Sequence, residues 1–163
     1  SIDCGVILDG LNTDSAVALI VGGEAAPEIK KFVDTAIQAL WAGIKQVKPG
    51  NRVSDISHAI EQKVKPHGYG IVEELTGHGI GYKLHEEPHV YNFGKAGKGP
   101  ALKPGMTLAI EPILTMGGTK IETLDDDWTI VTQDESWAIQ AEHTILVTET
   151  GVEVLTLRAN ERP

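Results

Sequence analysis

The chain has 163 residues, of which 41% are hydrophobic, and a formal net charge of −9. That length suits one hydrophobic core, so we expect a single domain over residues 1–163. The negative charge argues against a nucleic-acid partner, whose surface needs clustered lysine and arginine. No apolar run approaches the roughly 18 residues of a membrane span, and the single cysteine, Cys4, excludes an intrachain disulfide. These features predict a soluble protein of a reducing, cytoplasmic compartment with no membrane partner.

The first 22 residues alternate in hydrophobicity around Asp9-Gly10, a dipeptide that suits the positive φ angles of a two-residue hairpin turn. This turn places Asp3 opposite Ala16, and it puts Asp3 and Asp14 on one face, roughly 7–8 Å apart at the backbone. Two carboxylates at that spacing repel each other. A cation between them would remove the repulsion, and a solvated face is the alternative.

Two helices and several strands are expected in the rest of the chain. Apolar residues recur at helical spacing over residues 27–47, and a second helix is predicted over residues 54–64. Strands are predicted over residues 69–75, 106–114, 128–132, 138–148 and 152–157. The glycine-rich and lysine-rich segment 90–105 is interpreted as a flap over or beside a site. This alternation predicts an α/β (α+β) fold.

Three alternating glycines surround a histidine in Gly77-His78-Gly79-Ile80-Gly81, and a second histidine, His85, follows seven residues after the first. Backbone without neighbouring side chains indicates that something approaches it closely, and a metal ion or a substrate is the interpretation we favour. A glycine-rich turn with incidental histidines is the alternative.

Two glutamates, Glu111 and Glu142, interrupt apolar runs that are otherwise predicted to be buried strands. A buried carboxylate is costly without a partner, so both are candidate ligands. With Asp3, Asp14 and His78 they form a set whose four carboxylates would be neutralised by two divalent cations. Oxygen-rich sites with one imidazole suit Mn, Fe, Co or Zn. The pattern predicts a dinuclear centre that activates water for hydrolysis.

Three motifs, read with the Asp3 to Asp14 hairpin, resemble those of the type I methionine aminopeptidases. They are Gly77-His78-Gly79-Ile80-Gly81 with His85-Glu86-Glu87-Pro88, Lys103-Pro104-Gly105-Met106-Thr107 with Ile110-Glu111-Pro112, and Glu142-His143-Thr144 with Val147-Thr148-Glu149. The resemblance implies a pita-bread fold, in which an antiparallel sheet carries flanking helices. It also implies a metalloexopeptidase, a hydrolase that removes the initiator methionine from nascent polypeptides.

The resemblance further implies a role for each site residue. Asp3 would chelate one metal ion, His78 and Glu111 would bind the other, and Asp14 and Glu142 would bridge the two ions. His85 would contact the scissile peptide and stabilise the tetrahedral intermediate, while Glu111 would move the proton. Leu84 and Trp128 match positions that line the pocket for the methionine side chain.

The chain lacks the region that such enzymes carry before the residue matching Asp3. We therefore expect an N-terminally incomplete domain that is weakly active or inactive unless a second chain, or the missing segment, completes it. Two rival functions remain. One is an Xaa-Pro aminopeptidase or prolidase, which resembles this chain in its five ligands but carries an arginine near the last glutamate, where Ala138-Ile139-Gln140-Ala141 stands here. The other is a non-catalytic binding module.

Overall fold

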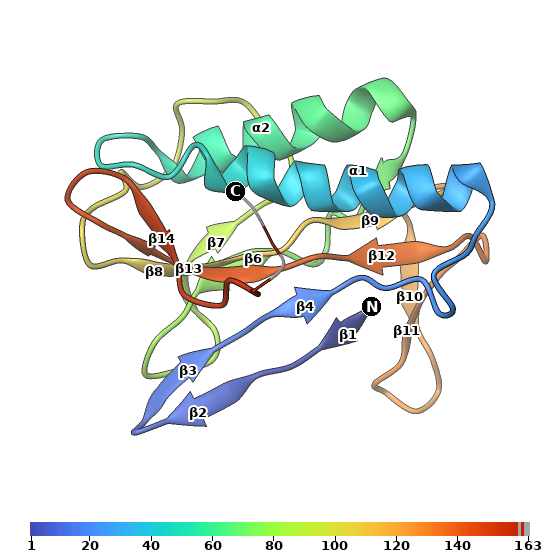
Figure 1. Ribbon diagram of the computed structural model, residues 1–163, viewed down its shortest axis with the longest axis horizontal. Helices are drawn as coiled ribbons and strands as arrows, with labels where there is room; N and C mark the ends of the chain where they lie inside the picture. Colours follow the sequence, from blue (N-terminus) through green and yellow to red (C-terminus); the bar gives the residue numbers. More distant parts are fainter. Residues whose placement is uncertain (160, 162–163) are drawn as a thin grey trace.

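The computed structural model describes residues 1–159 and 161, and in it two helices lie side by side over a layer of antiparallel strands (Figure 1). The helices are α1 (Pro27–Ile44) and α2 (Val53–Val64), and a 3-10 turn, Lys65–His67, follows them. The five-stranded sheet has the order β14 (Val152–Val154), β13 (His143–Val147), β8 (Thr107–Ile110), β6 (Gly77–Gly79), β7 (Glu86–Val90). A three-stranded sheet has the order β12 (Ala138–Gln140), β9 (Ile113–Thr115), β5 (Gly70–Ile71).

The N-terminal hairpin forms with the predicted register. Its inner ladder joins β1 (Ile2–Asp3) to β4 (Ala16–Val17), with Asp3 opposite Ala16, and its outer ladder joins β2 (Val6–Leu8) to β3 (Leu11–Thr13). Asp9 and Gly10 take φ angles of 50° and 82°, as the turn requires. The two ladders are separated by a break, and Asp14 lies in it.

Both predicted helices are present, and their apolar faces build the core. Helix α1 begins at Pro27, whose fixed φ suits the first turn, and it buries Phe32, Ala36 and Leu40 along one face. Ile60 of α2 packs so closely on α1 that a Cβ at Gly43 would lie 2.9 Å from its Cγ1 atom. None of the described helices is both long enough and apolar enough to cross a membrane.

Two strands that we predicted as continuous are each broken at the glutamate. The strand predicted over residues 106–114 divides into β8 and β9, with Glu111 and Pro112 between them. The strand predicted over residues 138–148 divides into β12 and β13, with Ala141 and Glu142 between them. Because β8 pairs with β13 and β9 pairs with β12, the two breaks lie opposite each other. The glutamates therefore lie where one sheet gives way to the other.

The other predicted strands are shorter than expected. Two of them are β5 and β14, and a third, β11 (Ile130–Thr132), pairs with β10 (Ile121–Thr123) in a separate hairpin. The interpretation of segment 90–105 as a flap is wrong for most of its length. Backbone N–H groups of Gly94, Gly97 and Lys98 donate to side chains of α2, at distances of 2.6 to 3.0 Å. The segment therefore docks on α2.

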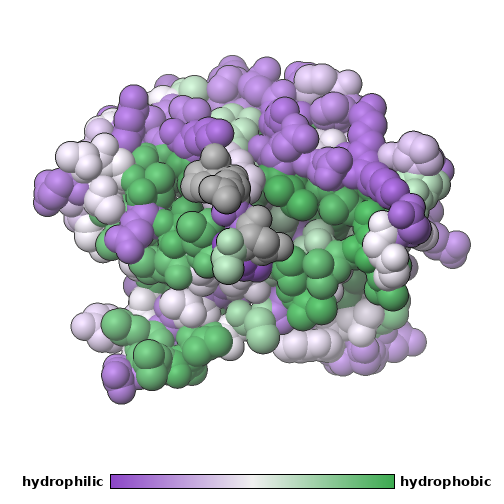
Figure 2. All heavy atoms as spheres, in the orientation of Figure 1, coloured by the Kyte–Doolittle hydropathy of each residue, from purple (hydrophilic) through white to green (hydrophobic). Residues whose placement is uncertain are grey.

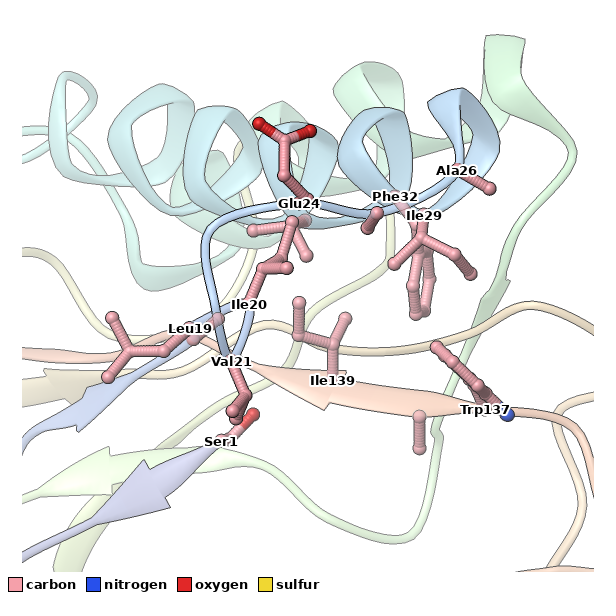
Figure 3. Close-up of a pocket in the computed structure, with 14 residues that line it drawn as sticks. Ser1, Leu19, Ile20, Val21, Glu24, Ala26, Ile29, Phe32, Trp137 and Ile139 are labelled. Carbon is pink, nitrogen blue, oxygen red and sulfur yellow. The ribbon is translucent and has the colours of Figure 1, made fainter.

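Apolar side chains remain exposed along the hairpin and beside α1. Ile7 and Leu8 of β2 are 71% and 72% exposed, and Figure 2 shows this hydrophobic tip at its lower left. Figure 3 shows a groove between the start of α1 and β12, lined by Ile20, Val21, Ile29, Trp137 and Ile139 among others. We call the exposed apolar residues of β1, β2 and β3 the hairpin surface; they are Ile2, Val6, Ile7, Leu8 and Leu11.

Candidate metal centre

The five residues singled out as candidate ligands come together in the structure, although they arise from separate segments. Asp3 is the last residue of β1, Asp14 lies in the hairpin break, and His78 is the central residue of β6. Glu111 and Glu142 occupy the two strand breaks. Their convergence follows from the pairing of β6 with β8 and of β8 with β13, and from the bond that ties the hairpin to the second break, Glu142 N–H to Ala16 O at 3.0 Å.

The distances within this group suit metal ions. Asp14, His78 and Glu142 each offer one ligand atom, and these atoms all lie within 4.8 Å of one another. His78 Nε2 is 3.5 Å from Glu111 Oε1. The opposite ring nitrogen, Nδ1, donates to the carbonyl oxygen of Gly79 at 2.9 Å, which leaves the lone pair of Nε2 directed into the group.

Gln140 is a member of the site that we did not predict. Its amide nitrogen, Nε2, donates to Asp3 Oδ2 at 3.2 Å, to Glu111 Oε2 at 3.2 Å and to Glu142 Oε2 at 3.3 Å. An amide nitrogen that donates to three carboxylates offsets part of their negative charge. The signal in the sequence was its spacing, because Gln140 precedes Glu142 by two residues and side chains at that spacing share one face of a strand.

Burial and mutual repulsion raise the pKa values of the three buried carboxyl groups of the site, Asp14, Glu111 and Glu142. Burial, followed by the charges of Asp14 and Asp3, raises the pKa of Glu111 to about 8. Burial and then the charge of Glu111 raise the pKa of Glu142 to about 9. The pKa of Asp14 is raised by the same causes, with Asp3 as its neighbour, and burial lowers the pKa of His78. Without cations, burial therefore favours the protonated forms of Glu111 and Glu142 and the neutral imidazole of His78.

The donor set fits divalent metal ions. Glu142 Oε1 is buried and has no hydrogen-bond partner among the described residues, so it is free to bind a cation. Four carboxylates and one neutral imidazole are ligands that Mn, Fe, Co and Zn accept. A cation would also displace the protons that burial holds on Glu111 and Glu142.

Of the other predicted site residues, His85 lies beside this group, Leu84 precedes His85 in the same loop, and Trp128 is in a separate hairpin. The His85 ring is exposed, its centroid is 4.4 Å from that of His78, and both rings line a depression with Thr76 and Glu87. Leu84 is 39% exposed beside it. Trp128 is 86% exposed in the turn between β10 and β11. The roles expected for these side chains stay predictions.

The glycines around His78 have a different purpose from the one we inferred. A Cβ at Gly77 would lie 2.4 Å from the carbonyl oxygen of Ala109, and a Cβ at Gly79 would lie 2.2 Å from that of Glu87. The close neighbours are thus the backbones of β8 and β7. These glycines let three strands pack tightly enough to hold His78 in place.

We expect Gly79→Ala to destabilise the protein by about 1–3 kcal/mol, because its new methyl group collides with backbone that has no room to move. Gly81→Ala is the matched control. Its Cβ would lie 3.5 Å from the nearest atom, Glu86 Oε1, and we expect a change within about 0.5 kcal/mol. Urea unfolding of both variants in EDTA measures this difference, and equal stabilities would contradict it.

Stability in the absence of metal should fall as the pH rises. Glu111 and Glu142 have an ordinary pKa of 4.5 when unfolded and values of about 8 and 9 when folded. The folded chain therefore binds more protons, and each group contributes stability that is complete below pH 4.5 and is lost as the pH rises through its folded pKa.

Melting temperatures in EDTA at several values between pH 6 and pH 9 test this expectation. The melting temperature of the parent should decrease across that range, and Glu142→Gln, which cannot ionise, should show a shallower decrease. A flat or rising curve for the parent would show that these carboxylates are not held protonated.

Comparisons with known proteins agree with this geometry. The sequence profile of metallopeptidase family M24 matches residues 1–149. Methionine aminopeptidase 1 of Bacillus subtilis is 44% identical over 156 residues, and methionine aminopeptidase of Clostridium acetobutylicum is 43% identical over 157 residues. Each alignment covers 96% of this chain and 62% of the relative, so the chain spans less than two thirds of the length of these proteins.

Solved structures extend the comparison to the fold. Methionine aminopeptidase from Thermotoga maritima superposes with a TM-score of 0.92 at 42% identity, covering 96% of this chain and 62% of that one. Prolidase from Pyrococcus furiosus superposes with a TM-score of 0.75 at 24% identity, covering 98% of this chain and 41% of that one, which shows a shared fold. The predicted pita-bread fold is confirmed, and metal ions are the cofactors that a metallopeptidase family implies. With its profile match, its fold and a converged set of acidic and histidine ligands, the chain belongs to metallopeptidase family M24.

Proposed function

We propose that this protein is a metal-dependent aminopeptidase that removes the N-terminal methionine from nascent polypeptides. The observation that carries the proposal is the convergence of Asp3, Asp14, His78, Glu111 and Glu142 around one small volume. The identity of more than 40% to methionine aminopeptidases supports methionine as the residue that is removed.

We propose two divalent cations, chosen from Co, Mn, Fe and Zn, as the cofactors. Asp3 would hold one of them and His78 and Glu111 the other, with Asp14 and Glu142 as ligands that would serve both. The charge of two divalent cations equals the negative charge of the four carboxylates when all four are ionised. When bound, they lower the pKa of water and polarise a peptide carbonyl.

The side chains around the cations supply proton transfer and orientation. Glu111 accepts the proton that the attacking water loses and delivers it to the departing amine. His85 lies on the exposed side of His78, where a peptide enters, and stabilises the oxygen of the tetrahedral intermediate. Leu84 and Trp128 contact the methionine side chain.

An Xaa-Pro peptidase is the second candidate, and the shared fold with prolidase favours it. Gln140 favours methionine removal. Xaa-Pro peptidases carry an arginine near the last glutamate ligand, and this chain has the neutral amide of Gln140 there. A peptide that begins with Met-Ala-Ser and one that begins with Xaa-Pro separate the two specificities.

The hairpin surface lies beside this site and exposes large apolar side chains. Such a patch marks a place where other polypeptide packs. The similar methionine aminopeptidases are longer than this chain, and their additional polypeptide is one possible cover. A second copy of the chain is the other.

We expect the chain, reconstituted with two equivalents of Co²⁺ or Mn²⁺, to release methionine from Met-Ala-Ser faster than in EDTA and to leave Xaa-Pro peptides intact. Glu111→Gln should lower kcat at least about 100-fold, because it removes the proton acceptor. Glu28→Gln, an exposed change in α1, is the matched control and should leave kcat unaltered. Liquid chromatography of the products measures both rates. Metal-dependent hydrolysis of the Xaa-Pro peptide in preference to Met-Ala-Ser would refute the proposed activity.

We also expect the 163-residue chain to self-associate through the hairpin surface at concentrations of tens of micromolar. Ile7→Lys should shift the distribution toward the 17.5 kDa monomer, because it places a charge in the apolar patch. Leu155→Lys, an exposed change beyond β14, should not. Light scattering across a concentration series measures the mass, and a parent that stays monomeric throughout would contradict the expectation.

A further inference from the structure

The residues that follow β14 contact both of the segments that carry the bridging ligands. Thr156, Arg158 and Glu161 lie beyond residue 149, where the match to family M24 ends. They are half-buried, and none of their recorded hydrogen bonds or ion pairs joins the five candidate ligands. Their partners are instead the residues next to Asp14 and Glu142. We call these three residues the C-terminal clasp.

Arg158 binds the hairpin strand directly after Asp14. Its Nη2 atom donates to Ser15 Oγ at 2.7 Å and to the carbonyl oxygen of Ala16 at 3.0 Å. The same carbonyl accepts the backbone N–H of Glu142, also at 3.0 Å. One guanidinium therefore touches the atom through which the two bridging segments are joined.

Glu161 fixes the direction of this guanidinium. Its Oε1 atom accepts from Arg158 Nη1 at 2.6 Å, and its Oε2 atom accepts from the backbone N–H of Arg158 at 2.9 Å. Oε2 also lies 3.2 Å from Nε2 of His143, which is fully buried beside Glu142. A planar guanidinium that Glu161 already holds through Nη1 loses little further freedom when it binds the strand.

Thr156 completes the clasp on the other segment. Its hydroxyl oxygen accepts the backbone N–H of Thr144 at 3.1 Å and is 2.9 Å from His143 Nδ1. The Thr144 hydroxyl in turn donates to the carbonyl oxygen of Asp14 and accepts its backbone N–H, both at 2.8 Å. Hydrogen bonds thus run from the clasp to the backbone of both bridging residues.

The hairpin's own ladder is short at this point. The ladder between β1 and β4 is two residues long, and it ends at the break that contains Asp14. Two carboxylates, Asp14 and Glu142, face each other across the site with ligand atoms within 4.8 Å, a separation at which they repel each other when ionised. Something must hold the two backbones together against that repulsion.

We propose that Arg158 is a positioning residue of the metal centre, which sets the separation of the bridging ligands Asp14 and Glu142 through the carbonyl of Ala16. The inference rests on the proposed dinuclear site. It adds to that site a residue from a part of the chain that the family match does not reach. Outer partners of this kind commonly change metal affinity by about 10-fold to 100-fold.

Cobalt binding to the 163-residue chain tests the proposal. Arg158→Met should weaken Co²⁺ affinity at least about tenfold, and Arg158→Lys, which keeps the charge but not the fork, should fall between this variant and the parent. Arg52→Met is the matched control, because the Arg52 side chain donates only to the carbonyl of Gly99 in the loop docked on α2. Its affinity should stay within about twofold of the parent value.

Two readouts separate positioning from a general loss of stability. The d–d absorption spectrum of bound Co²⁺ should change in Arg158→Met, since it reports ligand geometry. Unchanged affinity and an unchanged spectrum at a temperature where the variant is folded would overturn the proposal, even if its melting temperature in EDTA is lower.

Hydrogen exchange in EDTA gives a readout that needs no metal. Amides of residues 13–17 and 141–144 should exchange faster in Arg158→Met than in the parent, while those of α2 should not. If the parent itself binds no Co²⁺, the proposed function fails, and exchange alone decides the inference. Protection equal to that of the parent in both segments then overturns it.

Discussion

Repulsion among four clustered carboxylates, three of them buried, is the constraint around which this structure is built. Asp14, Glu111 and Glu142 are buried, and Asp3 faces them from the exposed edge of the site. Removing an acid from water while placing it beside others favours its protonated form. The raised pKa values of Glu111 and Glu142 express that cost. A chain retains so unfavourable an arrangement when the gain comes from a cation, which satisfies all four groups together. The amide of Gln140 donates to three of them and offsets their charge in the same way, but more weakly than a cation would.

Broken strands let the backbone meet this constraint. A side chain in the middle of a regular ladder points perpendicular to the sheet, toward a packed layer. At a break the chain leaves one sheet and joins the next. The side chain at the break therefore points into the space where the two sheets meet. Backbone groups freed at the breaks are still bonded: the Glu111 carbonyl accepts from the Asn92 amide at 3.0 Å, and the Glu142 N–H donates to Ala16 O at 3.0 Å. Each glutamate therefore enters the site with a hydrogen-bond partner for the peptide group named here.

Local signals in the sequence predicted local structure well. Asp9-Gly10 determined the hairpin register because only a few residues tolerate its φ angles, and an acid inside an apolar run marked Glu111 and Glu142 as candidate ligands. Long-range features escaped prediction. Nothing near Gly79 shows that Glu87 O will lie against it, so its glycine was attributed to a ligand. The breaks depend on which sheet each half-strand joins, and the clasp joins residues 142 and 143 positions apart, from Arg158 to Ala16 and Ser15. Such pairings are properties of the folded chain.

The hairpin and the metal centre are thermodynamically coupled, because two candidate ligands lie on an element that is weak by itself. Ladders of two and three residues with an exposed apolar tip are marginal in water. A cation that binds Asp3 and Asp14 only when the hairpin is docked stabilises the docked state by mass action, in proportion to its concentration relative to its dissociation constant. The same relation works in reverse, since every contact that docks the hairpin raises cation affinity. Two contacts that dock the hairpin are the hydrogen bond from the Asn12 N–H to Gly81 O, at 2.8 Å, and the hydrogen bond from Arg158 Nη2 to Ala16 O. Residues distant from the ions can therefore set how tightly the ions bind.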